Sequence, residues 1–142
     1  MASVVLQGVH RPSRVTFTWE RPSGFKAPLI CVGLQYADAL NVSALILPGI
    51  RQPLLRFLEN LASLDVEGSF EERTVRGVER EFELYCRPGS RGMIVCEVSL
   101  AADWEDQCWR VQVRLDLEAS GLPGILAQFR EFFDLSTWAG ND

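Results

Sequence analysis

Apolar and polar side chains alternate along several stretches of the chain, which is the period of two that predicts half-buried β-strands. In the first clear stretch, residues 14–20, Val15, Phe17 and Trp19 fall on one face and polar residues on the other. Turn-forming residues separate the stretches and set their ends. The pattern predicts strands at residues 14–20, 29–36, 40–47, 68–75, 80–86, 93–101 and 108–117.

Two of the later stretches indicate which side chains lie outward. In residues 80–86 the even positions are apolar from Phe82 onward, so Glu81 and Glu83 are expected to face solvent. In residues 108–117 the odd positions are apolar and the even positions, from Arg110 to Asp116, are polar. We therefore expect Asp116 to be solvated, and the outward arginines to form cross-strand ion pairs with the outward acids.

Two other stretches have apolar residues at helical spacing. The first predicts a helix that begins between Ile50 and Pro53 and ends near Ser63. The second begins after Ser120-Gly121 and carries an apolar stripe up to Phe133. Each has a proline near its start, where the missing N–H would have no intrahelical partner. Residues 102–107 are expected to form an acidic turn, and the tail 135–142 is expected to be frayed.

The predicted order is therefore strands, helix, strands, helix. Helices separated by runs of strands, with hairpin-like loops between the strands, are typical of α+β domains with antiparallel pairing. We expect one α+β domain over residues 1–142, mainly an antiparallel curved or sandwich-like β-sheet with two amphipathic helices packed on it. The sequence shows no internal repeat.

Composition adds an expectation about partners. The 142 residues are 47% hydrophobic and 23% charged, as in an ordinary soluble globular domain, with a net charge of −5. Residues 1–58 carry six basic and two acidic side chains, whereas residues 59–142 carry eight and seventeen. This balance argues against direct binding of nucleic acid, which needs a basic face. It suits a basic protein partner, although a net negative charge also simply keeps a small domain soluble.

The candidate chemistry is sparse. The four cysteines at positions 31, 86, 96 and 108 form no CxxC pair, and His10 is the single histidine, so neither a zinc site nor another metal site is expected. The N-terminus does not resemble a signal peptide, and no apolar run is long enough to cross a membrane. We therefore expect a cytoplasmic protein with reduced thiols, no catalytic residues and no cofactor.

A tryptophan within a three-acid turn is the most distinctive local feature. A large aromatic residue next to acids is typical of an interface anchor with steering charge, although Trp104 could instead fold back over the hairpin end. The sequence therefore predicts a partner-binding site that combines this turn with the outward acids of the neighbouring strands. Its residues are Glu81, Glu83, Glu97, Asp103, Trp104, Glu105 and Asp106.

The chain also resembles the bacterial WapI-type immunity protein family. The resemblance rests on the order of elements and on segments 41–47, 54–61, 68–71, 81–84, 92–98, 110–118 and 122–129, and it spans residues 6–133. It implies a non-catalytic cytoplasmic protein that binds and neutralises a cognate toxin domain, for which a basic toxin such as a nuclease would suit an acidic inhibitor. The alternatives are an accessory or structural subunit of another bacterial complex and a small-molecule-binding domain.

Overall fold

Two antiparallel sheets and two helices make up the computed structural model, which describes residues 3–63, 72–77, 79–104 and 107–134. Sheet A has the order β1-β2-β3-β4, formed by Val4–Gln7, Ser13–Glu20, Leu29–Tyr36 and Leu40–Ile46. Sheet B has the order β5-β6-β7-β8, formed by Arg73–Arg76, Phe82–Pro88, Met93–Trp104 and Gln107–Glu118. Short 3-10 turns, Pro48–Ile50 and Ala119–Gly121, lead into helices α1 (Arg51–Ser63) and α2 (Leu122–Phe132).

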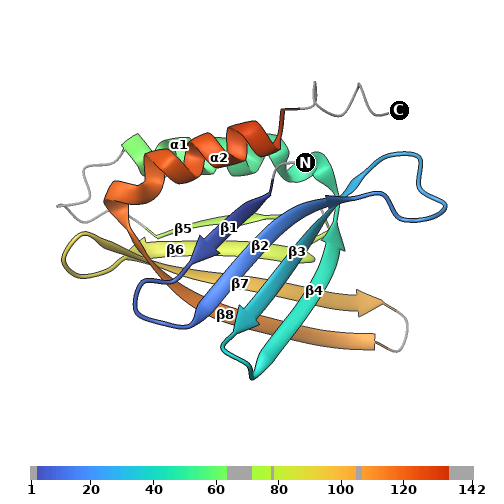
Figure 1. Cartoon of the computed structure of the whole chain (residues 1–142), viewed down its shortest axis with the longest axis horizontal. Coiled ribbons are helices and arrows are strands. Elements are labelled where there is room, and N and C mark those ends of the chain that lie inside the picture. The colour runs from blue at the N-terminus through green and yellow to red at the C-terminus, as the bar shows by residue number, and fades with distance from the viewer. Residues whose placement is uncertain (1–2, 64–71, 78, 105–106, 135–142) are drawn as a thin grey trace.

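The strands of sheet A cross those of sheet B, and both helices lie side by side along one end of the pair of sheets (Figure 1). Helix α2 contacts β1 and helix α1 contacts β5, which are edge strands of the two sheets. On the inside, strand β8 runs against β1, β2 and β3. The helices therefore close one side of a sandwich whose inner faces form the core.

The fold repeats one topological unit. Residues 4–63 and residues 73–132 each form a four-stranded antiparallel meander, a 3-10 turn and an α-helix, in the same order. No repeat is visible in the sequence because the two halves share this order without sharing obvious residue identities. Each half buries one face of its sheet only when the other half is present, so the two units form one core.

Aromatic rings from three elements meet at the centre of that core. The ring of Phe17 on β2 packs edge-on against Phe82 on β6, with centroids 5.8 Å apart, and against Phe129 on α2, at 5.0 Å. Trp19, two residues along β2, stacks on Phe132 at 5.0 Å, and its indole Nε1 donates a 2.8 Å hydrogen bond to the Phe132 carbonyl. Strand β2 thereby holds helix α2 by packing and by a directed bond.

The structure confirms the predicted α+β class, with antiparallel sheets and two helices packed on them. Both helices begin and end close to the predicted residues, and the proline lies in the first turn of α1 and of α2. The alternation of β6 and of the second half of β8 also places the predicted apolar side chains inward.

Other expectations need correction. The stretch 102–107 is not all turn, because β7 continues to Trp104 and β8 begins at Gln107. Strand β1 was not predicted; its four residues are paired and alternate in burial, but they are too few for a clear pattern. The strand predicted at 68–75 is seen as β5, while residues 68–71 and the tail 135–142 lie outside the described residues. Within the described part of the chain, neither helix has the length and apolar character needed to cross a membrane.

Replacing Phe129 by alanine is expected to lower the free energy of unfolding by about 3–5 kcal/mol, because it leaves a cavity between the two sheets and α2. Chemical denaturation followed by circular dichroism measures the change. Phe25, which is 55% exposed, provides the control, and Phe25→Ala is expected to change stability by less than about 0.5 kcal/mol. Equal effects of the two substitutions would show that the aromatic cluster does not hold the sheets together.

Candidate functional site

The outward faces of the two sheets differ in chemistry. On the strands of sheet A, all of which are described, the outward positions are mostly uncharged, with Arg14 and Glu20 as the exceptions. Apolar residues are exposed on this face as well, with Val5 45% and Leu45 41% accessible. Sheet A therefore offers a surface with little charge of its own.

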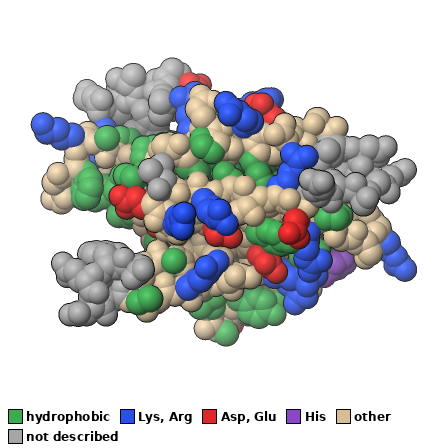
Figure 2. Space-filling view, turned by 180° about the vertical axis from the view of Figure 1, so that it is seen from behind, with side chains coloured by type: hydrophobic (Ala, Val, Ile, Leu, Met, Phe, Trp, Pro, Cys, Tyr) green, Lys and Arg blue, Asp and Glu red, His purple; other side chains and the backbone are tan. Residues whose placement is uncertain are grey.

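The outward face of sheet B is densely charged. Seen from behind, basic and acidic side chains are interspersed (Figure 2). The carboxylate of Glu83 on β6 lies 3.2 Å from Nε of Arg76 on β5 and 4.0 Å from Nη2 of Arg110 on β8. The pair Glu83–Arg110 is one of the predicted cross-strand contacts. Such exposed pairs contribute about 0–1 kcal/mol each, so they order the surface more than they stabilise the fold.

Glu97, a second predicted site residue, lies on β7 at the centre of this face. Its register partners are Tyr85 on β6 and Arg114 on β8. The Tyr85 hydroxyl donates a hydrogen bond to the Glu72 carboxylate, and this bond, with smaller contributions from burial, raises the pKa of Tyr85 above its ordinary value. Tyr85, the register partner of Glu97, lies two residues from Glu83 on β6, so Glu97 and Glu83 share the outward face of sheet B.

Glu81 lies at the start of this face but is held within a turn. Its Oε2 accepts a 2.9 Å hydrogen bond from the backbone N–H of Glu79, and a Cβ added at Gly77 would meet its carboxylate. Its Oε1 is buried and has no hydrogen-bond partner among the described residues. The side chain thus helps to shape the β5–β6 connection, beside the backbone bond from Ala101 N–H to the Glu81 carbonyl.

Two of the remaining predicted site residues, Asp103 and Trp104, lie in β7 on an extension of sheet B. The last residue of β7 that pairs with β6 is Leu100, whereas pairing between β7 and β8 continues to Trp104 and Gln107. Figure 1 shows β7 and β8 reaching past the ends of β5 and β6. We call residues 102–104 and 107–109 the distal ribbon. It carries Asp103 and Trp104, while Glu105 and Asp106 lie outside the described residues.

Asp116 is not solvated, contrary to expectation. It is 7% exposed, because the β1–β2 loop lies over it. Its carboxylate is 3.1 Å from Nε of Arg114 and 3.5 Å from Nε of Arg11. Its backbone carbonyl accepts a bond from Val9, and the buried Ser13 hydroxyl donates a 2.7 Å bond to the Arg114 carbonyl. Strand alternation could not predict this burial, since the covering loop is about a hundred residues away in sequence.

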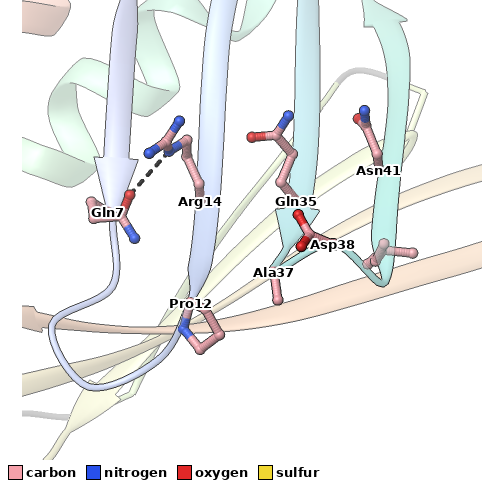
Figure 3. A pocket seen from close by; sticks show the side chains of 8 residues that line it. Gln7, Pro12, Arg14, Gln35, Ala37, Asp38 and Asn41 are labelled. Atoms are coloured by element: carbon pink, nitrogen blue, oxygen red, sulfur yellow. Dashed lines mark hydrogen bonds between the residues drawn. The ribbon is translucent and has the colours of Figure 1, made fainter.

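A shallow groove of about 540 Å³ opens at one end of sheet A (Figure 3). One polar side chain from each strand lies along it, in register: Gln7, Arg14, Gln35 and Asn41. The Arg14 Nε donates a 3.0 Å hydrogen bond to the Gln7 side-chain oxygen. This row was not predicted from the sequence, because its members are scattered polar residues that only the sheet register brings together.

The titratable groups do not converge on a reactive centre in the described part of the chain. His10 is exposed in the β1–β2 loop. Burial, and then the charge of Glu20, raise the pKa of the half-buried Cys31 thiol above its ordinary value, which disfavours the nucleophilic thiolate. Among the described residues, no three His, Cys, Asp or Glu side chains cluster as a metal site would require.

No protein-family model matches the sequence, and no curated protein is significantly similar to it.

The Asp116 contacts predict a stability effect. Asp116→Asn leaves two arginines without their carboxylate, so we expect the free energy of unfolding to fall by about 1–3 kcal/mol. Glu118→Gln, an exposed change on the same strand, is the control and is expected to be nearly neutral. Urea denaturation of both variants measures the difference, and equal stabilities would mean that backbone bonds alone hold the β1–β2 loop.

The cysteines are expected to react in a fixed order with iodoacetamide at neutral pH. Cys108 is exposed and should be alkylated first, Cys31 more slowly, and the buried Cys86 and Cys96 after unfolding. Timed quenching followed by peptide mass spectrometry gives the rate at each site. Alkylation of Cys31 faster than Cys108 would contradict the protected setting of Cys31.

Proposed function

We propose that this chain is a non-catalytic immunity protein that binds and neutralises a cognate toxin domain in the bacterial cytoplasm. The observation that carries the proposal is the distal ribbon, which continues two strands of sheet B beyond the rest of the sheet. A two-stranded extension from a packed sheet can enter a cleft on a partner without disturbing its own core. The resemblance to WapI-type immunity proteins supports the same function.

Charge favours a basic toxin, such as a nuclease. Asp103 belongs to the distal ribbon, and Glu105 and Asp106 follow it in the sequence. Residues 59–142, which include sheet B, carry seventeen acidic and eight basic side chains. In this proposal these three acids speed the encounter with a basic surface through long-range attraction.

The base of the ribbon is anchored, which would hold its end in place for binding. Trp109 on β8 is half-buried and packs against the hydrophobic core. Ala102, its register partner on β7, is also half-buried. In this proposal Trp104, at the end of β7, supplies the apolar anchor, since tryptophan is among the residues that contribute most to protein interfaces.

A small-molecule-binding function has one observation in its favour, the groove on sheet A. Its volume falls in the range of ligand sites. Its lining is mostly polar, and Gln7, Arg14, Asp38 and Asn41 are exposed, whereas ligand sites are mostly apolar and enclose their ligand. The groove therefore supports this function less well than the ribbon supports partner binding.

Co-expression tests the proposal. The reading frame next to this gene is cloned, and its C-terminal domain is expressed in a host with and without this chain. The proposal expects the domain to stop growth alone, and growth to return when this chain is present and forms a complex that survives size-exclusion chromatography. Growth arrest that persists despite good expression of this chain would contradict the proposal.

Neutralising the acids of the ribbon is expected to slow association with that toxin domain. The triple variant Asp103→Asn, Glu105→Gln, Asp106→Asn should lower the association rate about tenfold at low salt, and much less at high salt, where charges are screened. Stopped-flow fluorescence measures the rate. The control changes the same number of acids at exposed positions away from the ribbon: Glu20→Gln, Glu118→Gln, Glu131→Gln. Equal slowing in both triple variants would remove the ribbon from the binding site.

A further inference from the structure

Two of the four cysteines face each other inside sheet B. Cys86 on β6 and Cys96 on β7 are register partners, and their Sγ atoms lie 3.0 Å apart. Both side chains are buried, at 1% and 2% exposure, on the inward face of the sheet. The sequence predicts reduced thiols but not this pairing, because ten positions separate the two cysteines along the chain.

The turn between β6 and β7 fixes this register. Gly89 N–H donates to the Met93 carbonyl, and Gly92 adopts φ +73°, a conformation that favours glycine. A shift of one residue in the pairing would move one cysteine to the opposite face of the sheet. The alignment of the two thiols is therefore built into the hairpin.

The pair occupies the type of position that a disulfide can bridge. Backbone bonds from Gly89 to Met93 and from Ala101 to Glu81 mark the odd positions of β6 as hydrogen-bonded pairs. Cys86 and Cys96 lie between them, at a non-hydrogen-bonded pair. Opposite Cα atoms at such pairs are about 4.5 Å apart, which is inside the range that disulfides span. To form the bond, the two sulfur atoms must move closer together, whereas the strands need to move little.

We propose that Cys86 and Cys96 are a site of reversible disulfide formation that links β6 to β7 covalently when the protein meets a disulfide oxidant. In thiol–disulfide exchange, one cysteine thiolate attacks the oxidant RSSR and releases one RS⁻. The second cysteine thiolate then attacks the mixed disulfide and releases the other. The two cysteines lose two protons and two electrons in total, and RSSR becomes two RSH.

The burial of the pair makes this reaction slow in the folded protein. The hydrogen bond between the thiols, followed by burial, raises the pKa of Cys86 well above its ordinary value, so the reactive thiolate is scarce. An oxidant also has to reach central strands of the sheet, which requires local opening or an unfolded chain. The disulfide would therefore form during folding or by slow thiol–disulfide exchange, as a structural link between the strands. It would not act as a fast sensor of oxidants.

The experiment uses the full chain with Cys31→Ser and Cys108→Ser, so that Cys86 and Cys96 are the two remaining thiols. The protein is unfolded in urea, refolded in a buffer of reduced and oxidised glutathione, quenched with acid and analysed by intact mass and peptide mapping. We expect a product that has lost two hydrogen atoms and contains a Cys86–Cys96 cross-linked peptide. Its thermal midpoint should lie several degrees above that of the dithiol form.

A matched variant separates the link from other effects of oxidation. Adding Cys96→Ala leaves one thiol, so the same buffer should leave the thermal midpoint of this variant unchanged. Two free thiols after refolding, glutathione adducts in place of the cross-link, or a cross-linked form that is less stable than the dithiol would each overturn the proposal. If the variant does not fold, the mass and midpoint of the parent protein with and without reductant still decide the question.

Discussion

The packing of β2 against helix α2 is the contact on which the rest of the molecule depends. Phe17 contacts a ring from the opposite sheet and a ring from the helix, so one side chain joins three parts of the fold. Trp19 adds a stacked ring and a bond to the helix carbonyl. Large rings that interdigitate in this way fix the angle at which the two sheets cross, because few other arrangements fill the same volume.

That crossing places surfaces of different chemistry around one core. The outward face of sheet A carries few charges, whereas that of sheet B carries acids and arginines that pair across its strands. Each half ends in a helix that covers the open end between the sheets (Figure 1). The outward faces stay uncovered by these helices, and β7 and β8 are long enough to extend beyond their neighbours. The proposed binding site is a consequence of strand length and of where the acids lie.

Local periodicity was enough to predict the elements other than β1, but not the contacts between distant segments. The helices and the alternation of β6 followed from apolar spacing, because each buries a single face. The burial of Asp116 depends on a loop from the other half of the chain. The pairing of Cys86 with Cys96 depends on hairpin register, and the groove depends on the register of four strands. Of the predicted site, Glu83 and Glu97 share one outward face, while Glu81 is drawn into a turn.

Hydrogen–deuterium exchange of the chain with the toxin domain encoded beside its gene tests the central claim most directly, since it maps the contact surface without any substitution. We expect slower exchange on binding in peptides that cover residues 101–110, and a weaker slowing in peptides from the other parts of sheet B. Protection confined to residues 29–46 of sheet A, with no change at 101–110, would contradict this expectation and would place the binding surface on the weakly charged face of sheet A.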